Sequence, residues 1–125
     1  MSLSLVIVGS AGHVGYVLSD LPAYPQIRFA AYAPSYPEED VARYARPDAE
    51  GMAPRRHDDW RAMLDAERPA IVVVAGRYDL NAPIAIEAAR RGCHVISEKP
   101  AATTLHDLAA GTAALYGWIV TVQVV

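Results

Sequence analysis

The sequence has a single cysteine and no long hydrophobic run. With Cys93 as the one cysteine among 125 residues, an internal disulfide framework is excluded, and a reducing compartment, the cytoplasm, is expected. The apolar runs Leu3 to Val8 and Trp118 to Val125 are of strand length, so neither is long enough to span a membrane. The start of the chain also lacks the features of a secretory signal.

The charge of the chain is also small. Its net charge is -3 and its 11 basic residues are scattered, which excludes the broad basic surface of a nucleic-acid-binding protein. The four histidines, His13, His57, His94 and His106, lack metal-ligand spacing, and neighbouring Cys93 and His94 point to opposite faces of a strand, so no metal site is predicted. A composition of 53% hydrophobic and 20% charged residues is typical of one globular domain over residues 1–125.

Short β-type runs alternate with segments of helical periodicity. Strands are predicted at 3–8, 27–33, 71–75, 94–97 and 118–125, and helices at 12–20, 81–91 and 105–115, at a segment beginning with Pro37, and at one capped by Asp58 that contains Trp60. Gly92 is expected to cap the helix at 81–91. This alternation predicts an α/β fold of the Rossmann type, doubly wound, with a mostly parallel sheet and helices on both faces.

A glycine-rich turn joins the first strand to the first helix. It comprises Gly9, Ser10, Ala11, Gly12, His13, Val14 and Gly15. Gly9 would allow the tight turn, Gly12 would let backbone N–H groups approach a pyrophosphate, and Gly15 would permit close packing of helix on strand. The spacing G-x-x-G-x-x-G differs from G-x-G-x-x-G by Ala11. Nucleotide binding is favoured, and a glycine turn without a ligand is the alternative.

The end of the second strand bears on the choice of coenzyme. An acidic residue there usually accepts hydrogen bonds from the adenosine ribose, but the tip here is Ala33, Pro34 and Ser35, with no carboxylate. Ser35 would donate to a 2′-phosphate that Arg43 neutralises, which favours NADP slightly over NAD. Ser35 as an ordinary loop residue is an equal alternative, so the coenzyme is predicted as NADP or NAD.

The segment Ser97-Glu98-Lys99-Pro100 ends another strand, on the edge where open α/β sheets bind ligands. Lys99 is the only lysine of the chain, since the other ten basic residues are arginines. Its compact ammonium can donate a proton or a hydrogen bond, which arginine does less readily.

With these motifs in this order, the sequence resembles the Gfo/Idh/MocA oxidoreductases over nearly its whole length. The resemblance implies an N-terminal NAD(P)-binding Rossmann domain in which Lys99 lies near the nicotinamide and substrate as the catalytic residue. It also implies that Glu98 supports Lys99 and that Pro100 shapes the backbone there. Ala75, Gly76, Arg77 and Asn81 would surround the dinucleotide, with Asn81 standing where a histidine is common in the family.

The family's activity implies hydride transfer between a nicotinamide coenzyme and a sugar-like alcohol or carbonyl. Its second domain supplies the substrate pocket and an Asp/His pair, and we expect that domain to be absent here and the chain to be inactive alone. The alternative is a non-catalytic nucleotide-binding module or truncated relic. Such a module would self-associate as a homo-oligomer or bind a partner chain through apolar surface near Trp118 to Val125. Neither nucleic acid nor membrane is an expected partner.

Overall fold

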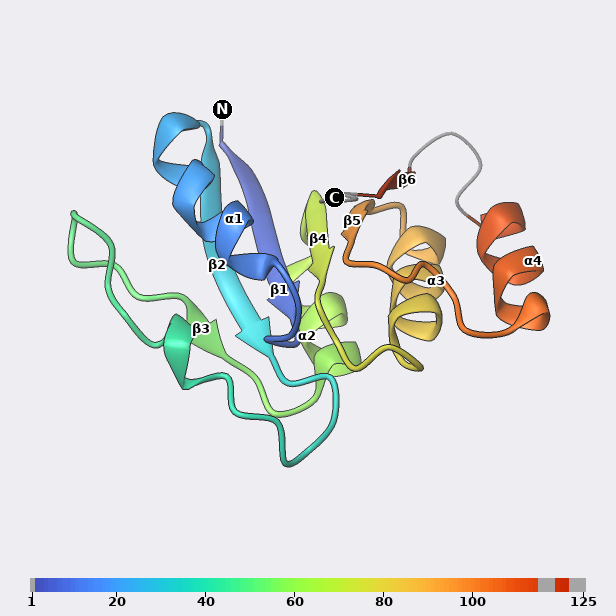
Figure 1. Ribbon diagram of the computed structural model, residues 1–125. Helices are drawn as coiled ribbons and strands as arrows, with labels where there is room; N and C mark the ends of the chain where they lie inside the picture. Colours follow the sequence, from blue (N-terminus) through green and yellow to red (C-terminus); the bar gives the residue numbers. More distant parts are fainter. Residues whose placement is uncertain (1, 115–118, 122–125) are drawn as a thin grey trace.

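The computed structural model describes residues 2–114 and 119–121, which form one twisted sheet with helices on both sides (Figure 1). Within these residues six strands lie in the order β3-β2-β1-β4-β5-β6, and every neighbouring pair is parallel. The strands are β1 Leu3–Val8, β2 Ile27–Ala33, β3 Arg55–Arg56, β4 Ile71–Val74, β5 His94–Ser97 and β6 Ile119–Thr121. The predicted Rossmann-type α/β fold is therefore confirmed.

The helices lie on the two faces of this sheet. They are α1 Val14–Asp20, α2 Trp60–Glu67, α3 Asn81–Arg90 and α4 Leu105–Ala114, with short 3₁₀ turns η1 Leu21–Ala23 and η2 Ala42–Tyr44. The described part of the chain contains no helix of the length and hydrophobicity that a membrane crossing requires. Of the strand predicted at 118–125, only Ile119–Thr121 is described, as β6.

Two hydrophobic cores hold the layers together. On one face, Trp60, Met63 and Leu64 of α2 pack with Ile84 of α3 against β1, β2 and β4. On the other, α1 and η2 pack through residues such as Val14 and Tyr44 against the same central strands. Because the centres of β1 and β4 are covered on both faces, residues 5–8 and 71–74 are continuously apolar and not alternating.

Two helix starts differ from the prediction. The first helix begins at Val14 and not at residue 12, because Gly12 has a φ of +61°, outside the helical region. The cap of α2 is Asp59 and not Asp58: the Asp59 side chain accepts a hydrogen bond of 3.0 Å from the backbone N–H of Arg61. Asp58 instead pairs with Arg56. Gly92, with a φ of +80°, follows the last residues of α3 as expected.

The helix predicted to begin at Pro37 is wrong. The long connection between β2 and β3 is irregular there, and only the short turn η2 forms, at Ala42–Tyr44. The polar side chains that suggested a first helical turn bind other backbone groups: Glu39 reaches Ser10 and Ser35, and Asp40 accepts from the N–H of Ala42. These tertiary and local hydrogen bonds replace those of a helix.

Tyr44 ties this irregular connection to the glycine turn. Its phenol donates a hydrogen bond of 2.7 Å to the carbonyl oxygen of Gly9, and its ring is buried. Burial raises the pKa of Tyr44 to about 12, so the phenol keeps its proton and remains a donor at neutral pH. The connection between β2 and β3 is therefore held to the glycine turn by one buried hydrogen bond.

We expect Tyr44→Phe to lower the free energy of unfolding by about 1 to 3 kcal/mol, because the buried Gly9 carbonyl loses its donor. Urea denaturation followed by circular dichroism measures the change. Tyr24→Phe is the matched control, since Tyr24 is half exposed and should change stability little. Equal stability of the Tyr44 variant and the wild type would show that the bond contributes nothing.

Candidate functional site

The carboxyl ends of the parallel strands meet along one edge of the sheet, the lower edge in Figure 1. Four segments follow these ends: the glycine turn after β1, Pro34 and Ser35 after β2, residues 75–81 after β4, and residues 98–100 after β5. The structure therefore brings the residues predicted from four separate parts of the sequence onto one edge, where doubly wound sheets bind their ligands.

Two glycines make the turn fit against the neighbouring strand ends. Gly9 has a φ of +89°, and a Cβ there would overlap the carbonyl of Ala75. A Cβ at Gly12 would lie 2.5 Å from the Cγ of Glu98. The turn is further fixed by the N–H of Ala11, which donates to the carbonyl oxygen of Ala75 at 2.8 Å. Only glycine combines these φ angles with this closeness.

The role expected for Gly15 is wrong. A Cβ at Gly15 would meet only the guanidinium of Arg43, at 3.5 Å, an ordinary van der Waals distance. Gly15 lies inside α1, where that helix does not press against a strand. Close packing of helix on strand therefore does not require a glycine at this position.

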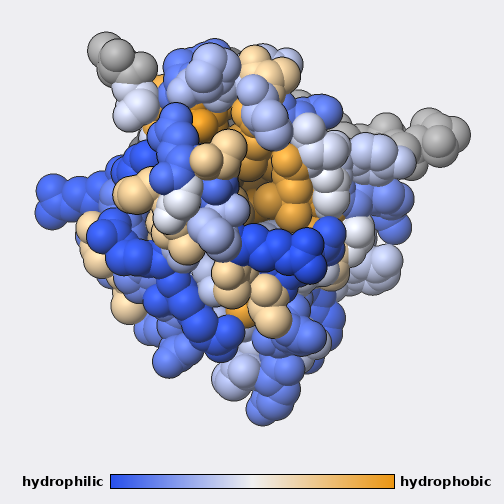
Figure 2. Space-filling view, turned by 90° about the vertical axis from the view of Figure 1, so that its left-hand side faces the viewer, coloured by the Kyte–Doolittle hydropathy of each residue, from blue (hydrophilic) through white to orange (hydrophobic). Residues whose placement is uncertain are grey.

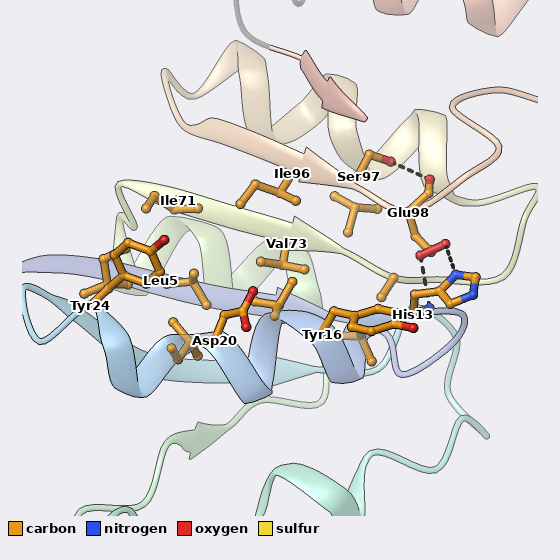
Figure 3. A pocket seen from close by; sticks show the side chains of 16 residues that line it. Leu5, His13, Tyr16, Asp20, Tyr24, Ile71, Val73, Ile96, Ser97 and Glu98 are labelled. Atoms are coloured by element: carbon orange, nitrogen blue, oxygen red, sulfur yellow. Dashed lines mark hydrogen bonds and ion pairs between the residues drawn. The ribbon is translucent and has the colours of Figure 1, made fainter. Parts of the chain in front are cut away.

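Glu98 reaches across from β5 to the glycine turn (Figure 3). One carboxylate oxygen accepts from the backbone N–H of His13 and the other contacts the His13 ring nitrogen Nδ1, both at 3.0 Å. Glu98 is 7% exposed; burial alone would raise the pKa of its carboxyl, but the bonds from His13 outweigh this effect and lower that pKa. The Glu98 carboxylate is thus ionised at neutral pH and accepts a hydrogen bond from the backbone N–H of His13.

A second carboxylate, that of Glu39, lies at the other side of the turn. It accepts from the backbone N–H of Ser10 at 2.9 Å, and from both the backbone N–H and the hydroxyl of Ser35 at 2.7 Å. The expectation that no carboxylate is available at the end of β2 is therefore wrong. Sequence reasoning missed Glu39 because it lies in the irregular loop after β2. Strand periodicity does not predict which side chains of such a loop return to the end of the strand.

The segment after β4 is held by hydrogen bonds and ion pairs among its own residues. Asn81 is fully buried, and its Oδ1 accepts from the N–H of Gly76 at 2.9 Å. Its Nδ2 is buried without a hydrogen-bond partner among residues 2–114 and 119–121. Arg77 is exposed, pairs with Asp79 and lies over the ring of Tyr36. These residues border the edge, with Ala75 and Gly76 buried beneath the glycine turn.

The side chain of Lys99 contacts Tyr78. Its ammonium lies 3.5 Å from the hydroxyl of Tyr78 and 5.0 Å from the centre of that ring, so the partner of the lysine is an aromatic residue after β4. The Lys99–Pro100 peptide bond is cis. The contact of Tyr78 with Lys99 arises from the adjacency of β4 and β5, because the two residues follow these paired strands.

An apolar cavity of about 350 Å³ opens beside the turn, between α1 and strands β1, β4 and β5. Leu5, Val73 and Ile96 line its floor, and Tyr16 lies on its α1 wall (Figure 3). A hollow lined by hydrophobic residues is also visible on the surface in Figure 2. Its polar end is formed by His13 and Glu98, which places an apolar surface next to the donors of the turn.

These observations bear on whether a dinucleotide fits this edge. The N–H groups of Ser10 and His13 already bind carboxylate oxygens, which shows that the turn presents its donors to anions. A diphosphate offers oxygens of the same kind, and the Glu98 side chain fills the space that a Cβ at Gly12 would take. The residues present therefore fit a dinucleotide, provided that the N–H of His13 exchanges Glu98 for the ligand. No cluster of metal-binding side chains occurs in the described part of the chain.

Strand order, the glycine turn at the point where that order reverses, and the donors of the turn together define a dinucleotide-binding domain of the Rossmann class. The sequence profile described as "Oxidoreductase family, NAD-binding Rossmann fold" matches residues 4–124. The chain belongs to this family, the Gfo/Idh/MocA oxidoreductases, and is an NAD-binding domain of an oxidoreductase.

Known proteins agree with this assignment. Levoglucosan dehydrogenase of Pseudarthrobacter phenanthrenivorans is 38% identical over 78 residues, which are 58% of this chain and 20% of that protein. A putative oxidoreductase structure from Thermotoga maritima superimposes with a TM-score of 0.78 at 32% identity, over 94% of this chain and 36% of that one.

A levoglucosan dehydrogenase solved with NADH and levoglucosan has a TM-score of 0.73 at 26% identity, over 95% of this chain and 34% of that one. The chain thus spans about a third of these solved structures and a fifth of the curated relative.

Two glycines, Gly12 and Gly15, give a sharp test of the turn. We expect Gly12→Ala to lower the free energy of unfolding by about 1 to 2 kcal/mol or more, because its φ is positive and Glu98 would be displaced. Gly15→Ala should instead raise it by about 0.5 to 1 kcal/mol, since alanine favours a helix and finds room there. Urea unfolding measures both, and a loss of stability at Gly15 would contradict this account.

Proposed function

We propose that this chain binds the coenzyme of an oxidoreductase that transfers hydride between a nicotinamide and a sugar-like alcohol or carbonyl. The observation that carries the proposal is the pair of backbone donors, Ser10 and His13, on a glycine turn beside Lys99 and the apolar cavity. Support for a sugar-like substrate comes from the two relatives described as levoglucosan dehydrogenase.

In this proposal each part of the edge has its own task. The N–H of His13 holds the diphosphate, while the N–H of Ser10 keeps its bond to Glu39 at the adenosine side. Ala11, Gly12, Val14 and Gly15 form the rest of the turn. Ser35 lies at the adenosine side, while Ala75, Gly76, Arg77 and Asn81 border the coenzyme from the β4 side. When bound, the coenzyme supplies the hydride chemistry.

Lys99 is the residue we assign to catalysis. Its ammonium would donate a hydrogen bond or a proton to the substrate oxygen, and the hydroxyl of Tyr78, 3.5 Å away, orients it. Glu98 and Pro100 shape the backbone that presents Lys99. Because Glu98 bonds to His13, it would act on Lys99 through backbone position and not through an ion pair.

Further parts of the activity are proposed from the family alone. Substrate turnover in the family draws acid and base groups from a second domain, so we propose that the 125 residues bind coenzyme but do not turn substrate over. A cytoplasmic location and self-association stay predictions. The apolar surface expected near Trp118 to Val125 lies largely outside the described residues.

The first test is a titration of the chain with NADH, in which binding is measured by calorimetry. We expect saturable binding with a dissociation constant between about 1 µM and 1 mM, the usual range for metabolic ligands, and no oxidation of levoglucosan with NAD. Gly12→Ala should weaken binding, because the backbone donors are displaced. Absence of binding at millimolar NADH would reject the proposal, and turnover of levoglucosan would reject the claim of inactivity.

A second test locates Lys99 relative to the nicotinamide. Lys99→Met should weaken NADH binding by about fivefold, the value of one hydrogen bond, but leave binding of ADP-ribose, which lacks the nicotinamide, unchanged. Arg90→Met is the control, since this exposed cation lies at the far end of α3. Equal weakening for both ligands would place Lys99 away from the nicotinamide.

A further inference from the structure

We infer that Glu39 recognises the adenosine ribose and makes this chain prefer NAD to NADP. The inference rests on the proposed function, because it concerns the adenosine side of the same site. It reverses the slight preference for NADP that the end of β2 suggests from the sequence alone.

The first step is the position of the carboxylate. Glu39 comes from the irregular connection after β2, yet its two oxygens bridge the glycine turn and the strand end: Oε2 binds the N–H of Ser10, and Oε1 binds the N–H and hydroxyl of Ser35. The ends of β1 and β2 are where a Rossmann domain meets the adenosine ribose. An acidic side chain is thus present there, although it does not come from the strand itself.

The second step is the hydrogen-bonding capacity that remains. A carboxylate has about four lone-pair sites, and the described bonds use three of them, two on Oε1 and one on Oε2. Oε2 therefore retains a lone pair that can accept a hydrogen bond from one ribose hydroxyl. The Ser35 hydroxyl, once rotated, would free a second site on Oε1 for the other hydroxyl of a ribose diol.

The third step is the fate of the groups expected to bind a 2′-phosphate. The hydroxyl of Ser35 donates to Glu39, so this donor is not directed to a phosphate. Of the nearby cations, Arg77 is neutralised by Asp79 through bonds of 2.6 and 3.0 Å. Arg43 is exposed and lies over the ring of Tyr44, with its guanidinium toward Gly15.

The balance of charge then decides between the coenzymes. A 2′-phosphate at this end of β2 would bring up to two negative charges next to the half-buried carboxylate of Glu39. Glu38, on the same loop, adds a further negative charge near Arg77. The ribose diol of NAD carries no charge and supplies two donors to a carboxylate that accepts them, whereas NADP replaces one donor by an anion.

The experiment compares NADH with NADPH on the whole chain by calorimetry, in the wild type and in Glu39→Gln. We expect the wild type to bind NADH at least about tenfold more tightly than NADPH, and Glu39→Gln to reduce this ratio by about tenfold, chiefly by improving the affinity for NADPH. Glu38→Gln is the matched control: it removes the same charge one residue away and should leave the ratio within about twofold.

The outcomes separate this inference from the proposed function. If both coenzymes bind and NADPH binds as well as NADH or better, the inference is overturned while dinucleotide binding stands. If Glu38→Gln changes the ratio as much as Glu39→Gln does, a diffuse charge effect replaces the specific contact and the inference again fails. If neither coenzyme binds, both the proposed function and the inference are rejected. The wild-type comparison remains decisive even if Glu39→Gln does not fold.

Discussion

The close approach of the glycine turn to the ends of β4 and β5 is the constraint on which the rest of this edge depends. Gly9 lies against the carbonyl of Ala75, and Gly12 lies against the side chain of Glu98, in both cases closer than any Cβ permits. This closeness lets Ala11 bond to Ala75 and His13 bond to Glu98, so that the turn after β1 is hydrogen-bonded to the residues that follow β4 and β5. A larger residue at either glycine would separate the turn from the segments that follow β4 and β5.

At this edge of the sheet, carboxylates already occupy two donors of the turn. Glu39 binds Ser10 at the adenosine side, and Glu98 binds His13 toward the cavity. Buried or half-buried backbone N–H groups need acceptors, and in the protein by itself these two side chains provide them. A dinucleotide must replace Glu98 at His13 with its own oxygens, whereas Glu39 can keep its bonds and add one. Glu98 therefore competes with the dinucleotide for the His13 N–H, whereas Glu39 binds the dinucleotide.

Much of the site could be predicted from the sequence, since its residues follow buried strands. Gly9 comes directly after β1 and Lys99 is the second residue after β5, and the strands of a parallel sheet bring their ends to one edge whatever the loops do. Glu39 and Tyr78 could not be predicted in this way. Both lie in irregular segments, and their partners, Ser10 and Lys99, are distant in sequence.

The sequence by itself determined the class of fold, the family and the edge that carries the site, because hydrophobic periodicity and glycine spacing are local properties of the chain. Only the tertiary structure decided which side chains bind the donors of the turn. It also decided that the segment after Pro37 is no helix and that Gly15 needs no close contact. The reason is physical: a carboxylate or a hydroxyl reaches any donor that the packing of distant strands brings within about 3 Å, and local sequence does not encode that distance.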